Sequence, residues 1–154
     1  MTFLDLELFN TIRKNIPICC IDLLFVDSDN RILLMRRCNH PAKDLLWFPG
    51  GRLLKDEKID QAIRRKSIEE TSINPLSFSF VDIQETIFSQ ISTYSYSIHT
   101  INLCFLISWS KNPQDALIND SQHSDLVWLP ISDAISRDDI HNGVSNPLRK
   151  LSYV

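Results

Sequence analysis

The sequence predicts an α/β domain. Two strand-like runs, residues 18–26 and 31–37, come before residues 59–71, a segment without Pro or Gly whose apolar residues recur at helical spacing. Further strand-like runs follow at residues 78–89, 96–109 and 126–129. Because strands stand on both sides of a central helix in the sequence, we expect one mixed α/β domain over residues 1–154.

The remaining elements follow from local patterns. Apolar residues at helical spacing predict a short amphipathic helix within residues 4–12, which ends before Pro17. The polar residues 27–30 indicate a turn between the first two strands, and residues 111–124 read as a polar loop. Short helices are expected near residues 131–136 and 146–152.

Composition narrows the class of protein. A chain of 154 residues that is 44% hydrophobic can form one substantial core. No run approaches the roughly 18 apolar residues of a membrane span, and Asp5 and Glu7 stand where a signal peptide would be basic. The four cysteines contain no Cys-x-x-Cys spacing and read as core or incidental thiols. We therefore expect a cytoplasmic protein with no membrane partner.

The charge pattern indicates a small anionic ligand. The formal net charge of −3 lacks the basic balance typical of a nucleic-acid binder, so we expect no nucleic-acid partner. Against this acidic mean, five basic residues gather around one loop: Arg36, Arg37, His40, Lys43 and Arg52. Arginine binds phosphate oxygens in a fixed fork, so the cluster suits a small polyanion. The alternative is an ordinary solvated basic loop.

Two of the three glycines stand side by side at Gly50 and Gly51, after Pro49. In a chain so poor in glycine, this turn indicates a place where side chains do not fit, such as a ligand site. On the helix that follows, Lys66, Glu69 and Glu70 share one face. The two carboxylates and the loop carbonyls are ligands that Mg2+ takes. The alternative is an exposed helix with ordinary Arg65–Glu69 and Lys66–Glu70 ion pairs.

Residues 51–73 resemble the Nudix box, G-x5-E-x7-R-E-U-x-E-E-x-G-U, where U is a bulky apolar residue. The matching positions are Gly51, Glu57, Arg65, Glu69, Glu70 and Ile73. Three positions depart from the pattern: Lys66 replaces the first helix glutamate, Ser67 an apolar residue and Ser72 the final glycine. The resemblance implies an α/β/α sandwich around a mixed β-sheet. Because the missing glutamate binds metal or helps to activate water in ordinary Nudix pyrophosphohydrolases, the usual mechanism is not expected.

The chain is most similar to the GDP-mannose mannosyl hydrolases of this family. The shared features are the run 41–52, Asp22 in the first strand, Arg37 at the end of the next, and Gln122-His123 before the strand that ends in Trp128. The likeness runs from Phe3 to about residue 141 and is weakest between residues 83 and 100. It implies a homodimer in which the amino-terminal segment, including Phe3, closes the nucleotide site.

The resemblance also implies a mechanism. Mg2+, with Mn2+ as a substitute, is expected on Glu70, the Gly50 carbonyl and Gln122, with Glu69 close by. Arg37 and Arg52 would stabilise charge on the departing GDP, and Asp22 would orient the substrate, although a structural ion pair is the alternative for this buried carboxylate. His123 is the candidate general base, with His99 and His40 behind it, because its imidazole suits that role and a box carboxylate is missing. A solvated loop histidine is the alternative.

Three other functions stay open at this point. One is a pyrophosphohydrolase that cuts P–O and yields GMP and a sugar 1-phosphate. Another is a non-catalytic nucleotide-sugar binding domain, in which the Lys66 ammonium takes a metal position. The last is a purely structural relic of the fold.

Overall fold

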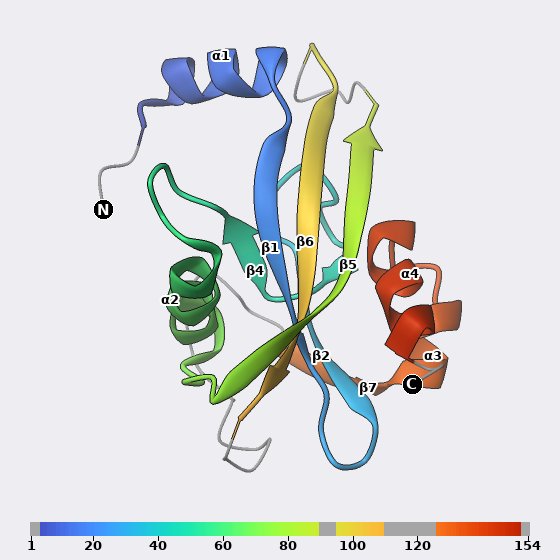
Figure 1. Ribbon diagram of the computed structural model, residues 1–154. Helices are drawn as coiled ribbons and strands as arrows, with labels where there is room; N and C mark the ends of the chain where they lie inside the picture. The colour runs from blue at the N-terminus through green and yellow to red at the C-terminus, as the bar shows by residue number, and fades with distance from the viewer. Residues whose placement is uncertain (1–3, 90–94, 110–125, 152–154) are drawn as a thin grey trace.

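Two β-sheets with helices on opposite sides form the domain (Figure 1). The computed structural model describes residues 4–89, 95–109 and 126–151. The four-stranded sheet has the order β4-β1-β6-β5 and the three-stranded sheet the order β3-β2-β7. The strands of the two sheets are β1 (Ile18–Phe25), β2 (Arg31–Arg36), β3 (Leu46–Trp47), β4 (Gly50–Arg52), β5 (Ser77–Phe88), β6 (Ile98–Ser108) and β7 (Leu126–Pro130).

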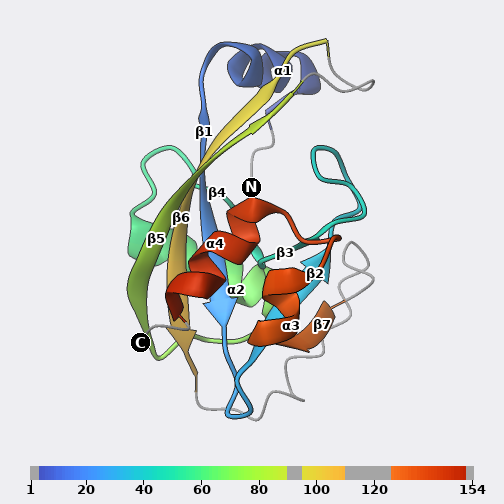
Figure 2. The same ribbon diagram turned by 90° about the vertical axis from the view of Figure 1, so that its right-hand side faces the viewer.

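The predicted mixed sheet and α/β architecture are confirmed. β1 pairs parallel with β6 and antiparallel with β4, so the larger sheet contains both kinds of ladder. Helix α2 (Ile59–Thr71) covers one side, and α3 (Ile131–Ser136) and α4 (Asn142–Leu151) cover the other (Figure 1). Helix α1 (Leu6–Asn15) lies across the end of β1 and β6, away from the other helices (Figure 2).

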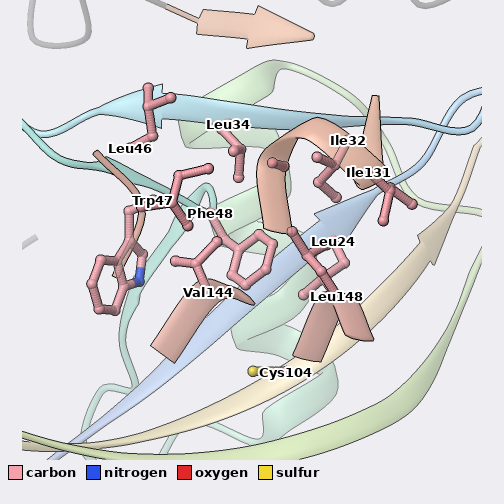
Figure 3. Packing of buried hydrophobic residues seen from close by; sticks show 12 residues of the cluster. Leu24, Ile32, Leu34, Leu46, Trp47, Phe48, Cys104, Ile131, Val144 and Leu148 are labelled. Carbon is pink, nitrogen blue, oxygen red and sulfur yellow. The ribbon is translucent and has the colours of Figure 1, made fainter. Parts of the chain in front are cut away.

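Two apolar clusters fill the space on either side of β1, because its side chains alternate between two buried faces. Leu24 points into the cluster that α3 and α4 cover, together with Phe48, Val144 and Leu148 (Figure 3). Neighbouring residues on the other face pack beneath α2; these are Ile21, Leu23 and Phe25, against Ala62 and Ile63. A strand buried on both faces holds any polar residue within it away from water.

Helix α2 accommodates two departures from the Nudix box. Ser67 is fully buried, and its hydroxyl donates to the Ile73 carbonyl at 2.5 Å, so a polar residue is satisfied in an apolar position. Ser72 ends the helix in the left-handed region with φ 51°. Glycine tolerates that conformation without strain, whereas a residue with a Cβ loses about 1–2 kcal/mol there.

The structure differs from the expectations in three respects. β3 and β4 are strands of two and three residues that the sequence pattern did not indicate. α4 begins at Asn142 rather than near residue 146. α1 has no buried residue, so it is not held by a buried apolar face. The expected polar loop 111–124 lies outside the described residues.

None of the helices within the described ranges combines the length and the apolar character needed to cross a membrane.

Candidate active site

A pocket of about 760 Å³ opens where β1, β4, α2 and the segment after β2 meet. It brings together five of the residues predicted from the sequence: Asp22, Arg37, Gly50, Arg52 and Glu70. The lining of this pocket does not include Glu69. Phe3, Gln122 and His123 lie outside the described residues, so their predicted roles stay predictions.

Gly50 and Gly51 stand where neighbouring atoms come too close for a side chain. Gly50 in β4 pairs with Asp22 in β1, and a Cβ on Gly50 would stand 2.1 Å from the Ile21 carbonyl oxygen. A Cβ on Gly51 would stand 2.7 Å from Cε of Lys66. The first contact is with rigid backbone and the second is with the end of a flexible chain. Gly50 therefore fixes the packing of β4 on β1, and Gly51 leaves room for Lys66.

Asp22 is the buried carboxylate of the pocket, with 2% of its surface exposed. Its Oδ2 accepts hydrogen bonds from Asn102 Nδ2 at 2.9 Å and from Trp47 Nε1 at 3.3 Å. Burial raises the pKa of Asp22 from 3.8 to about 7, although these two hydrogen bonds and the charge of Arg37 oppose the rise. The expected partner was an arginine or a substrate hydroxyl, whereas the hydrogen bonds come from neutral groups, Asn102 on the neighbouring strand β6 and Trp47 on β3 of the other sheet.

We expect Asp22→Asn to flatten the pH dependence of folding stability. Folding raises the pKa of this acid, so between pH 3.8 and about 7 the folded state keeps a proton that the unfolded state has lost. The free energy of unfolding therefore contains the full contribution of this group below pH 3.8 and loses it as the pH rises through about 7. The loss amounts to a few kcal/mol at order of magnitude. Asparagine has no charge to bury and still accepts the two hydrogen bonds. Urea unfolding at a series of pH values measures the effect.

Asp29→Asn provides the control, because that carboxylate is 72% exposed on the turn after β1. The free energy of unfolding of the wild type and of Asp29→Asn should fall together between these pH limits, and that of Asp22→Asn should fall less. Parallel curves for all three proteins would show that Asp22 does not titrate abnormally.

Four arginines line the same pocket, and Arg37 and Arg52 are the two expected to stabilise the leaving group. Arg37 Nε donates to the Pro41 carbonyl at 3.0 Å, and its Cζ lies 5.6 Å from the centroid of the Trp47 ring. Burial lowers the pKa of Arg37, while the charges of Asp22, Cys20 and Glu70 oppose that shift; arginine keeps its charge in proteins. Arg52 stacks on Phe9 of α1, with Cζ 4.2 Å from the ring centroid. α1 thereby reaches the site through Phe9, and Arg13 of the same helix also lines the pocket.

The pocket lining also includes Phe9, Trp47 and Asn102, to which the sequence pattern assigned no individual role. Asn102 faces the site because β1 and β6 pair with Cys20 opposite Asn102, a register that a sequence pattern does not reveal. The Asn102 Oδ1 atom is buried without a hydrogen-bond partner among the described residues. A buried acceptor without a partner is costly, so this atom is suited to a ligand donor.

The charged face of α2 forms a dense network. Arg65 binds Glu57 through two contacts, Nε to Oε1 at 2.6 Å and Nη2 to Oε2 at 2.7 Å, and also donates to the Arg52 carbonyl at 3.1 Å. This bidentate pair ties the glycine loop to the helix. The Lys66 ammonium lies 2.8 Å from Glu70 Oε1 and 3.1 Å from Glu69 Oε2. Both ion pairs of the alternative interpretation, Arg65–Glu69 and Lys66–Glu70, are therefore present.

The chemistry of these donors fits a magnesium ion that takes its other ligands from substrate and water. The Glu70 carboxylate is 9% exposed at the pocket and Glu69 is 36% exposed beside it, and both are hard oxygen donors. No cluster of three or more His, Cys, Asp or Glu side chains suited to a metal occurs among the described residues. Mg2+ often uses one or two carboxylates with substrate phosphates and water, so the pair suffices for such an ion.

The comparisons with known proteins place the chain in a family. The NUDIX domain model matches residues 20–151. The chain therefore belongs to the NUDIX domain family, the class of Nudix hydrolases. Members of this class generally use divalent metal ions, typically Mg2+.

Two curated proteins are similar in sequence. The ADP-ribose pyrophosphatase of Methanocaldococcus jannaschii is 38% identical over 50 residues, 32% of this chain and 30% of that protein. The low-salt glycan biosynthesis protein Agl8 of Haloferax volcanii is 28% identical over 129 residues, 77% of this chain and 74% of that protein. The chain thus spans less than a third of the first relative and about three quarters of the second.

Solved structures share the fold. The MutT NUDIX hydrolase of Burkholderia pseudomallei has a TM-score of 0.71 at 20% identity, over 89% of this chain and 99% of that chain. The NUDIX domain of Shewanella oneidensis NrtR, solved in complex with ADP ribose, has a TM-score of 0.67 at 19% identity over 98% of both chains. At these identities the likeness extends to the fold alone.

Proposed function

We propose that this protein hydrolyses a nucleotide sugar, GDP-mannose or GDP-glucose, to GDP and a free hexose by substitution at the anomeric carbon. One observation carries the proposal: a single pocket joins the buried Asp22 carboxylate to Arg37, Arg52 and Glu70, while Lys66 replaces a box glutamate. The pocket volume of about 760 Å³ falls within the usual range for ligand sites.

The lining of the pocket offers groups for both parts of such a substrate. Arg37 and Arg52 provide fixed positive charge for a diphosphate. Asp22 and the unpartnered Asn102 Oδ1 provide buried acceptors for hydroxyl groups. Sugar hydroxyls are donors that match these acceptors.

The proposed reaction transfers the hexosyl group from GDP to water. The oxygen of water forms a bond to that carbon while the C–O bond to the diphosphate breaks, and the bonding electrons leave with GDP. His123 accepts the proton of the attacking water, and Arg37 and Arg52 stabilise the negative charge that grows on the leaving group. Attack from the opposite face inverts the anomeric configuration.

Mg2+, or Mn2+ in its place, would be held by Glu70, the Gly50 carbonyl and Gln122, with Glu69 close by. When bound, the divalent ion supplies further charge stabilisation to the diphosphate.

We also propose that the protein is a homodimer in which Phe3 contributes to the site, that it is cytoplasmic, and that it has no nucleic-acid partner. On the last point, the related fold of NrtR from S. oneidensis is known in complex with a 27mer DNA.

Pyrophosphate cleavage is the second candidate, favoured by the retained Glu69 and by the partial similarity to an ADP-ribose pyrophosphatase. The product distinguishes the two reactions. We expect incubation with GDP-mannose and Mg2+ to yield GDP and free mannose, so that an added phosphatase releases phosphate from GDP and none from a sugar phosphate. GMP with mannose 1-phosphate would assign the protein to the pyrophosphohydrolases, and ligand binding without turnover to the binding domains.

A further inference from the structure

The position of Lys66 sets it apart from the other basic residues of the site. Its side chain is 17% exposed and lies against the backbone of Gly51, where a Cβ would meet Lys66 Cε at 2.7 Å. From there the ammonium contacts Glu70 Oε1 at 2.8 Å and Glu69 Oε2 at 3.1 Å. Because Gly51 has no side chain, there is space for the Lys66 side chain, and the Glu69 and Glu70 carboxylates bind its ammonium.

The surrounding charges make this ammonium the immediate counter-ion of Glu70. Glu69 is shared with Arg65, whose Nη1 lies 3.1 Å from the same Oε2 atom. Across the pocket, Arg37 interacts electrostatically with Glu70. The Lys66 Nζ atom contacts one Glu70 oxygen directly at 2.8 Å, so a divalent ion on the same carboxylate is repelled by the ammonium and competes with it for the negative charge.

We propose that the Lys66 ammonium occupies the cation position between Glu69 and Glu70. A divalent ion then binds the Glu70 carboxylate fully only when it displaces this ammonium. Lys66 then sets the affinity of the site for divalent ions and keeps it low in the absence of nucleotide. The inference concerns the same site as the proposed function, but it does not require that GDP-mannose is the substrate.

The test is Mn2+ binding to the full chain without nucleotide, followed by electron paramagnetic resonance of the free ion. A charge within ion-pair distance changes the proton affinity of a carboxylate by about 10- to 1000-fold, and the competing ammonium should act on a metal ion in the same sense. We therefore expect Lys66→Met, which keeps an unbranched chain of similar length, to bind Mn2+ at least about tenfold more tightly than the wild type. Lys66→Gln repeats the test if the first variant does not fold.

Two controls fix the interpretation. Lys55→Met removes one positive charge from the loop between β4 and α2, at a side chain that is 88% exposed and paired with Asp56, and should leave Mn2+ affinity at the wild-type value. Adding Glu70→Gln to Lys66→Met should abolish the gain. Unchanged or weaker Mn2+ binding by Lys66→Met and Lys66→Gln, or a gain that survives Glu70→Gln, would overturn the proposal. Because no nucleotide is present, these results do not depend on which reaction products GDP-mannose gives.

Discussion

Glu70→Gln is expected to lower kcat by about 10²–10³-fold. The substitution keeps the shape of the side chain but removes the negative charge that would hold a divalent ion at the pocket. Charge stabilisation by such an ion is worth several kcal/mol, and each 1.36 kcal/mol corresponds to about a factor of ten in rate. Steady-state kinetics with GDP-mannose at saturating Mg2+ measures the loss.

Glu69→Gln is the matched comparison, because the two carboxylates are neighbours on α2 but differ in environment. Glu70 lines the pocket, whereas Glu69 is more exposed and binds Arg65 and Lys66. We expect Glu69→Gln to reduce turnover much less. An equal collapse of both variants would show that the carboxylates act together, as in ordinary Nudix pyrophosphohydrolases.

His123→Gln is expected to lower kcat by about 10²–10⁴-fold, the usual range for the loss of one general base, with substrate binding changed far less. The wild-type rate should fall on the acid side, because a protonated imidazole cannot accept the proton of water. That acid limb of the pH–rate profile should disappear in His123→Gln. The profile of kcat between acidic and mildly alkaline pH gives the answer.

The structure adds a second group that could produce the same limb. Burial raises the pKa of Asp22 to about 7, within the range where histidine titrates. A limb that persists in His123→Gln and disappears in Asp22→Asn would assign the titration to Asp22. His99→Gln is the control, since His99 contacts Glu85 Oε1 at 2.9 Å and does not line the pocket. Near-normal turnover of His123→Gln would exclude His123 as the base and direct attention to Glu69.

The sequence was most informative where one periodicity governs a long element. Helix α2 has the predicted bounds, Ile59–Thr71, and its predicted face carries Lys66, Glu69 and Glu70 in contact. The apolar run of β1 correctly predicted that Asp22 would be buried. Periodicity could not reveal β3 and β4, because two or three residues are too few to show an alternation.

Contacts between segments that are far apart in the chain could not be predicted from the sequence. The hydrogen bonds to Asp22 come from residues 25 and 80 positions away, Trp47 and Asn102, and depend on the course of the loop and on the β1–β6 register. The early start of α4 likewise involves a tertiary contact, because Gly143 packs where a Cβ would stand 3.3 Å from the Trp47 ring. These contacts have no local signature.

The position of the isotope in GDP is the most direct test of C–O cleavage. The reaction is run with GDP-mannose and Mg2+ in water labelled with a heavy oxygen isotope, and the nucleotide product is analysed by mass spectrometry. Attack of water at the anomeric carbon leaves every oxygen of the diphosphate in place, so we expect GDP without label. Labelled GDP, or GMP as the nucleotide product, would contradict substitution at carbon and place the attack at phosphorus.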